Sequence, residues 1–126
     1  MKQKLIKTKE WKDGELISDS RVELNGELDL QNYDAVIHLA ALVSVPESFE
    51  DPSRYHEVNV EATRRLFMSC VESGIKKVIF SSSAAVYSTL EAPDKFTSSP
   101  YSNSKILGER HSRSIASSST KFTIFR

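Results

Sequence analysis

Three apolar segments stand out along this chain of 126 residues. Residues 34–41 form a near-continuous apolar run, and shorter runs cover residues 77–81 and 122–126. Continuous runs, as opposed to strict apolar–polar alternation, are typical of strands that are buried on both faces of a parallel sheet. We therefore expect three strands at these places, with the first and second buried on both sides.

The segment between the first two runs shows helical spacing instead. Apolar side chains recur at intervals of three or four positions over residues 55–71, which predicts an amphipathic helix. We expect this helix to begin near Pro52, with Asp51 or Ser53 as the capping residue. Gly74 follows the last apolar position and is a suitable residue to end the helix.

A second helix is predicted from Tyr101 to about Ser117, after a polar loop that contains Pro93 and Pro100. The first 33 residues are only weakly patterned. Short strands are expected there at residues 16–17 and 22–24, because glycine, asparagine and aspartate separate these apolar pairs as turn signals.

From residue 34 onward, the order is therefore strand, helix, strand, helix, strand. This alternation with short connections is typical of an α/β layer with a parallel sheet and right-handed crossovers. In such sheets, ligands bind beyond the carboxyl ends of the strands. Residues 40–41 and 81–83 lie at two such ends, so we expect them to belong to a functional site.

The composition of the chain argues against several classes of function. The chain has 17 basic and 17 acidic residues, and this balance gives no sign of a nucleic-acid partner. No apolar run reaches the ~18 residues of a membrane span, and the polar N-terminus does not resemble a signal peptide. Cys70 is the only cysteine, and its helical apolar surroundings favour a buried, unreactive thiol. We therefore expect a single cytoplasmic domain without a metal site.

The residues with the most chemical promise are Ser83, Tyr101 and Lys105. Ser83 ends a run of three serines after the second predicted strand, and Tyr101 and Lys105 are four residues apart on the second predicted helix. Residues at this spacing share one helix face. A nearby ammonium stabilises a phenolate, which makes a tyrosine a better acid–base catalyst near neutral pH. A tyrosine–lysine pair is common by chance, but the serines at a strand end make proton transfer the more specific interpretation.

Two further polar residues interrupt apolar segments. Asn59 lies inside the first predicted helix, where it is either a solvent-facing residue or a polar hook that orients active-site or cofactor groups. His38 lies inside the first predicted strand, where a hydrogen-bonded core histidine is favoured over a metal ligand.

Taken together, these segments resemble the NAD-dependent epimerase/dehydratase family, which belongs to the extended short-chain dehydrogenases/reductases. UDP-glucose 4-epimerases are the most similar type. The resemblance extends over about residues 34–126, in the family's order. The matching pieces are residues 34–41, 59–63, 77–87, 99–105 with Glu109, and 123–126.

The resemblance implies a role for each candidate residue. Tyr101 would be the catalytic acid/base and Ser83 would contact the reacting oxygen of the substrate. Lys105 would bind the nicotinamide ribose and favour the tyrosine phenolate. The remaining residues implied to line the cofactor are Leu39, Ala40, Ala41, Asn59 and Ser81, with Tyr101 and Lys105 completing this set.

The resemblance also implies NAD or NADP as cofactor, a nucleotide sugar as substrate and a partial Rossmann-like, doubly wound parallel sheet. Some members of the family act instead on non-sugar alcohols or ketones, and this alternative stays open. Members often form homodimers through the two helices, so we expect a homodimer here. No membrane or nucleic-acid partner is expected.

Glycine is scarce for such a family. The four glycines, at positions 14, 26, 74 and 108, are too far apart for a glycine-rich phosphate-binding turn. We therefore expect residues 1–126 to form one partial domain that lacks the first strand, the glycine turn with its helix, and the C-terminal substrate domain. A truncated, inactive product or binding module is the alternative to an active enzyme. Because the phosphate-binding turn is missing, we expect the isolated chain to bind NAD weakly or not at all.

Overall fold

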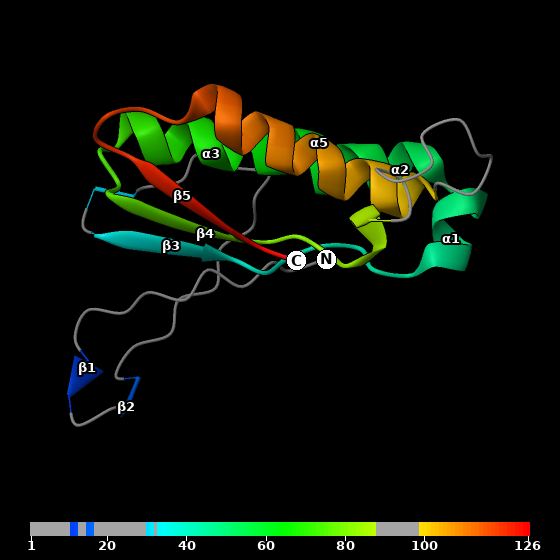
Figure 1. The fold of residues 1–126 in the computed structure, drawn as a ribbon, viewed down its shortest axis with the longest axis horizontal. Coiled ribbons are helices and arrows are strands. Elements are labelled where there is room, and N and C mark those ends of the chain that lie inside the picture. The colour runs from blue at the N-terminus through cyan, green and yellow to red at the C-terminus, as the bar shows by residue number, and fades with distance from the viewer. Residues whose placement is uncertain (1–10, 13–14, 17–29, 32, 88–98) are drawn as a thin grey trace.

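The computed structural model describes residues 11–12, 15–16, 30–31, 33–87 and 99–126. Strands β3 (Ala35–His38), β4 (Lys77–Ser81) and β5 (Lys121–Phe125) form a parallel sheet in the order β3-β4-β5. Their register aligns Val36 with Val78, and Val78 with Phe122. The three predicted strands and their parallel arrangement are therefore confirmed (Figure 1).

Near the N-terminus, β1 (Trp11–Lys12) and β2 (Glu15–Leu16) pair as a short antiparallel hairpin. The second of these strands overlaps the strand predicted at residues 16–17. The other predicted strand, at residues 22–24, lies outside the described residues, as does the polar loop around Pro93.

The first predicted helix is confirmed in its extent, because the helical stretch begins at Pro52 and ends at Glu72, just before Gly74. Two features of this region were not predicted. A separate helix, α1 (Val45–Glu50), precedes α2 (Pro52–His56), and a π-helical turn, η1 (Glu57–Glu61), joins α2 to α3 (Ala62–Glu72). Pro46 lies in the first turn of α1, where no backbone N–H is needed. Helix α5 (Pro100–Ile115) closely matches the second predicted helix.

The helix ends follow from local chemistry. Ser44, Asp51 and Ser99 each begin a helix, and the side chain of each accepts a hydrogen bond from a backbone N–H in the first turn. Gly74 has φ of +72°, a left-handed conformation that glycine adopts without strain. Of the two predicted caps for α2, Asp51 is confirmed.

The helices cover one face of the sheet. In Figure 1, α3 and α5 lie side by side on the same side of β3, β4 and β5. Inward-facing residues such as Val36, Val78 and Phe80 are buried, whereas their neighbours Ile37 and Ile79 on the other face are only half-buried. The expectation of strands buried on both faces is therefore wrong for the described residues, in which a covering layer is present on one side alone.

Phe80 occupies the centre of this covered face. Its ring stacks on the imidazole of His38 at 5.6 Å between centroids and meets Phe67 edge-on at 5.5 Å. Helix α5 approaches the ring closely at Gly108, where a Cβ atom would lie 2.7 Å from Phe80 Cζ. The glycine thus sets the short distance between α5 and β4.

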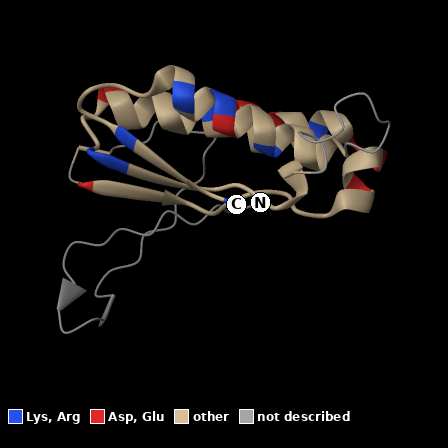
Figure 2. Ribbon diagram, in the orientation of Figure 1, with Lys and Arg blue, Asp and Glu red and all other residues tan. Residues whose placement is uncertain are grey.

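A buried carboxylate joins α5 to two strands. Glu109 Oε1 accepts hydrogen bonds from Ser82 Oγ at 2.6 Å and from Arg126 Nε at 2.9 Å. Its Oε2 accepts from Arg126 at 2.7 Å and from Arg113 at 3.0 Å. Charged residues of both signs lie along α5 (Figure 2), but this carboxylate is almost fully buried, with 3% of its side chain exposed.

The protonation of Glu109 reflects two opposing effects. Burial alone would raise the pKa of this carboxyl group. The hydrogen bonds from Arg126, Ser82 and Arg113, together with the charge of Arg126, outweigh burial and lower the pKa to about 2. The carboxylate therefore remains ionised over the whole physiological range.

We predict that Gly108→Ala destabilises the fold by about 1–3 kcal/mol, because the added methyl group overlaps a ring that His38 and Phe67 hold in place. Alanine has a higher helix propensity than glycine by ~1 kcal/mol. A loss of stability would therefore show that the steric overlap dominates, and a gain would show that helix propensity does. Urea denaturation measures the change in stability. The exposed Arg110→Ala on the same helix is the control, and a Gly108→Ala variant at least as stable as the parent would show that the ring can move.

A second prediction concerns acid. Because the folded pKa of Glu109 lies below its ordinary value of 4.5, its stabilisation is present above about pH 4.5 and is lost as the pH falls towards about 2. We expect Glu109→Gln to lower the free energy of unfolding by about 3 kcal/mol at neutral pH. Between about pH 4.5 and pH 2, the free energy of unfolding should fall less steeply in this variant than in the parent.

The matched control is Glu57→Gln. Glu57 pairs with Arg65 at 2.9 Å, but both side chains are largely exposed, so the loss should stay below about 1 kcal/mol. Equal losses in the two variants, measured by urea denaturation across the pH range, would contradict the stabilising role of the buried carboxylate.

Candidate functional site

The candidate site lies at the carboxyl end of β4, where α5 delivers a buried amine. Lys105 is 4% exposed, and its Nζ donates a hydrogen bond to the Ser81 carbonyl oxygen at 2.9 Å. The same ammonium lies 5.2 Å from the centroid of the Phe80 ring. Burial lowers the pKa of Lys105 to about 8, so the amine is close to the point at which it gains or loses a proton near neutral pH.

Tyr101 precedes Lys105 by one turn of α5 and faces the same region. It is 9% exposed and packs in a small apolar cluster with Leu42 and Tyr55. Ala85, from the turn that follows β4, packs against this cluster. The tyrosine therefore lies between the segment after β3 and the segment after β4, as expected for a residue at the ends of these strands.

Ser83 is half-buried in the turn after β4, where its Oγ accepts a hydrogen bond from the backbone N–H of Ala85 at 3.2 Å. The structure thus connects Lys105 to Ser81, two residues before Ser83. Among the described residues, no hydrogen bond joins Ser83, Tyr101 and Lys105 to one another directly.

Asn59 acts as a polar hook, one of the two interpretations of this residue. It is 2% exposed and lies in the π-helical turn η1. Its Oδ1 accepts from the Leu42 N–H at 2.9 Å, and its Nδ2 donates to the Leu42 carbonyl at 2.9 Å and to Ser104 Oγ at 3.1 Å. One amide therefore ties the segment after β3 to α5, next to Lys105.

Tyr55, four residues before Asn59, makes polar contacts that the sequence pattern did not predict. Tyr55 is fully buried, and its hydroxyl donates to the Ser44 carbonyl at 2.7 Å and contacts Glu47 Oε2 at 3.2 Å. Burial, followed by the nearby Glu47 carboxylate, raises the pKa of this phenol. The i, i+4 spacing from Asn59 was the available signal, because residues so spaced can reach the same neighbouring segment.

Tyr55 and Asn59 together hold residues 39–44, the segment that follows β3. Leu39 is 58% exposed, and Ala40 and Ala41 are half-buried. A fixed backbone with small side chains at this strand end leaves surface that a flat ligand can contact.

His38 is a core residue, as the favoured interpretation predicts. Its Nε2 lies 2.8 Å from Thr63 Oγ1. Burial, and then the charge of Lys105, lowers the pKa of His38 to about 3, so the ring is neutral at physiological pH. Burial also raises the pKa of Cys70 to about 12, which makes this thiol unreactive. Within the described residues, no group of histidines, cysteines and carboxylates has the arrangement of a metal site.

In the described part of the chain, no helix combines the length and the apolar character that a membrane crossing requires.

Comparisons with known proteins agree with this geometry. The family model described as "NAD dependent epimerase/dehydratase family" matches residues 3–126, a longer range than the resemblance from residue 34 onward. UDP-glucose 4-epimerase 3 of Oryza sativa subsp. japonica is 38% identical over 91 residues, which are 68% of this chain and 24% of the relative. The chain thus spans about a quarter of the length of the curated relatives it matches.

Solved structures give the same result. UDP-glucose 4-epimerase from Bifidobacterium longum, solved with NAD⁺ and UDP, has a TM-score of 0.64 and 36% identity over 74% of this chain and 30% of its own. TunA, an NAD-dependent NDP-hexosamine 5,6-dehydratase, has a TM-score of 0.68 and 34% identity over 80% of this chain and 36% of its own. The fold is therefore a part of the Rossmann-like α/β sheet of these enzymes, and the chain belongs to the NAD-dependent epimerase/dehydratase family.

Proposed function

We propose that this chain is the catalytic middle of an NAD-dependent epimerase or dehydratase that acts on a nucleotide sugar. The observation that carries the proposal is the buried Lys105 ammonium one helical turn from Tyr101, beside the serine end of β4. A buried cation is costly unless it has a partner or a task. Among the described residues, the Lys105 ammonium has one hydrogen-bond partner, the Ser81 carbonyl, which leaves two further N–H groups that a ligand can use.

The proposed chemistry is the oxidation of a sugar hydroxyl. Tyr101, as the phenolate, takes the hydroxyl proton, while Ser83 donates a hydrogen bond to the same oxygen. The hydride of the C–H bond leaves with its electron pair, so that the carbon becomes a carbonyl. When bound, NAD supplies the hydride acceptor. Return of the hydride to the opposite face of the carbonyl, with the proton returned to the oxygen by Tyr101, would give the epimer, whereas loss of water from the keto sugar would lead to a dehydrated product.

Lys105 has two tasks in this scheme. Its charge favours the phenolate of Tyr101 by electrostatic attraction, and its free N–H groups can hold the ribose hydroxyls next to the nicotinamide. Burial keeps the charge unscreened by water, which strengthens both effects. Phe80 and the neutral His38 provide apolar surroundings at this end of the sheet, which supports both tasks of Lys105.

The residues proposed to line NAD are Leu39, Ala40, Ala41, Asn59 and Ser81, with Tyr101 and Lys105. Their fixed backbones at the ends of β3 and β4 support this assignment, because parallel sheets bind cofactors there. The relatives solved with NAD support it as well. We propose NAD over NADP on the same basis.

Partners and location complete the proposal. The relatives solved with UDP-sugars, such as MoeE5 with UDP-glucose, support a nucleotide-sugar substrate. A homodimer through the outward faces of α3 and α5 is proposed because these helices pack together on one side of the sheet. The free, buried thiol of Cys70 fits a reducing compartment such as the cytoplasm.

The first test is turnover. With UDP-glucose and saturating millimolar NAD, the chain is expected to convert the sugar, and Tyr101→Phe is expected to lower kcat by about 10²–10⁴-fold, because the acid–base group is lost. Product analysis by liquid chromatography measures both. The control is Tyr33→Phe, which changes a tyrosine just before β3, at the opposite end of the sheet. Equal rates for the parent and Tyr101→Phe would contradict the assignment.

The second test is cofactor affinity. We expect calorimetry to show only weak binding of NAD to this chain, because its four glycines do not form a phosphate-binding turn. Lys105→Met should weaken binding further, whereas Lys121→Met, at the exposed start of β5, should not. Micromolar affinity in the parent would show that other residues hold the pyrophosphate. A chain that binds NAD without any turnover would favour the alternative of a binding module.

A further inference from the structure

Three residues of α5 are spaced by four, and the last two of them contact the end of β4. Tyr101 and Lys105 carry the proposed chemistry, and Glu109 follows one turn later. All three are buried. Because residues at this spacing share a helix face, the carboxylate of Glu109 continues the row that the tyrosine and the lysine begin. The proposed reaction gives this third residue no part.

The contacts show what Glu109 holds. Lys105 Nζ donates to the carbonyl of Ser81 at 2.9 Å, and the next residue, Ser82, donates from its Oγ to Glu109 at 2.6 Å. The Ser82 N–H in turn donates to the Phe125 carbonyl at 2.6 Å. Consecutive residues at the end of β4 are therefore fixed by α5 on one side and by β5 on the other. Ser83 is the residue that comes directly after them.

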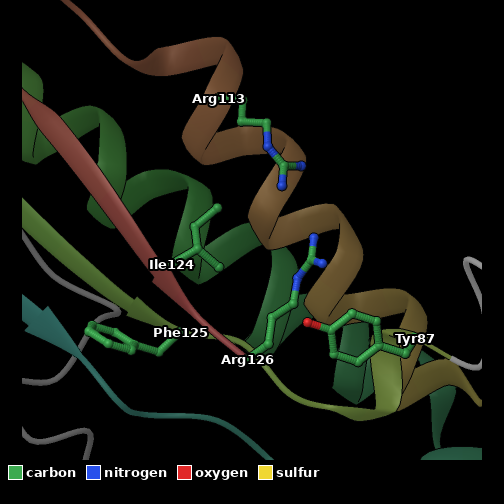
Figure 3. Close-up of a pocket in the computed structure, with 5 residues that line it drawn as sticks. All are labelled: Tyr87, Arg113, Ile124, Phe125 and Arg126. Atoms are coloured by element: carbon green, nitrogen blue, oxygen red, sulfur yellow. The ribbon is translucent and has the colours of Figure 1, made fainter.

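The carboxylate is itself held in one orientation. Arg126 pairs with both of its oxygens and Arg113 with one, so that with Ser82 each oxygen accepts two hydrogen bonds. The two arginines line a pocket of about 390 Å³ beside α5, and Arg126 lies 5.1 Å from the ring centroid of Tyr87 (Figure 3). A carboxylate with all of its acceptor positions filled cannot rotate freely, which makes it a firm anchor.

We propose that Glu109 is a positioning residue that acts through Ser82 to fix the end of β4, and so aligns Ser83 with Tyr101 and Lys105. This inference rests on the proposed function for the roles of those three residues. The anchoring itself is a property of the chain alone. Loss of the Ser82 hydroxyl should therefore loosen the strand end and admit water to the Lys105 ammonium, while the ion pairs of Glu109 stay in place.

The experiment compares Ser82→Ala with Ser112→Ala. Ser112 is a matched control, because it is also buried and its hydroxyl also makes one hydrogen bond near Glu109, but to the backbone carbonyl of its own helix. Two quantities are measured in the full chain. The first is the pKa of Lys105, from the ¹³Cε shift in lysine-labelled protein, with Lys105→Arg used for assignment. The second is kcat and KM for the conversion of UDP-glucose.

In Ser82→Ala, we expect the pKa of Lys105 to rise from about 8 towards its ordinary value of 10.5, since hydration removes the cause of its lowering. Kcat should fall about 10-fold with KM unchanged, the signature of an interaction that matters in the transition state. Ser112→Ala should change neither quantity, and Ser82→Thr, which keeps a hydroxyl, should restore both. A pKa in Ser82→Ala that is unchanged or lowered would overturn the proposal.

The two proposals can fail separately. If the parent chain has no turnover, the proposed function fails, but the pKa of Lys105 still tests the anchor because it needs no substrate. Should Ser82→Ala fail to fold, Arg113→Lys replaces it, because lysine keeps the positive charge and so does not raise the pKa of Lys105 by electrostatics alone. That arginine is 58% exposed and contributes one of the four hydrogen bonds. A smaller rise in the pKa of Lys105 is then expected, and no rise would count against the anchor.

Discussion

The close approach of α5 to β4 is the constraint on which the described structure depends. Gly108 allows the helix backbone to come near the Phe80 ring, and this proximity places two long side chains, Lys105 and Glu109, within reach of consecutive strand residues. A wider spacing would leave the ammonium without its carbonyl partner and the carboxylate without Ser82. The apolar packing against Phe80 and the hydrogen bonds of Lys105 and Glu109 thus both depend on the short distance between α5 and β4.

Charge at this interface is arranged in a definite order. The ammonium of Lys105 lies deep, where burial makes its protonated form less favourable, and the Glu109 carboxylate lies beside two arginines that keep it ionised. His38, which stacks on Phe80, is neutral, since burial and the charge of Lys105 both disfavour its protonated form. Of these three buried groups, the lysine one helical turn from Tyr101 is therefore the one whose pKa, about 8, lies nearest to neutral pH. This is what proton transfer requires of a site.

The sequence was a good guide wherever local patterns determine structure. The apolar runs located all three strands of the parallel sheet, Gly74 marked the end of α3, and the Tyr101–Lys105 spacing placed both residues on one helix face. It was a poor guide where distant residues compete. The π-helical turn at Asn59 depends on contacts with Leu42 and Ser104, and no periodicity within the helix itself could reveal them. The polar contacts of Tyr55 were missed for another reason: an aromatic residue on a helix is ordinarily interpreted as a core residue.

The π-helical turn between α2 and α3 has a consequence for how this segment tolerates change. A π turn holds one residue more than an α turn over the same hydrogen-bonded span, so the buried face of α2 and the buried face of α3 are offset by one position along the chain. Insertions and deletions are therefore not equivalent here. The deletion of a single residue within Glu57–Glu61 could be absorbed as a regular α-helix, at the cost of turning Asn59 away from Leu42 and α5. Because of the extra residue, one continuous helical stretch packs against the sheet with α3 and holds the segment after β3 with Tyr55 and Asn59.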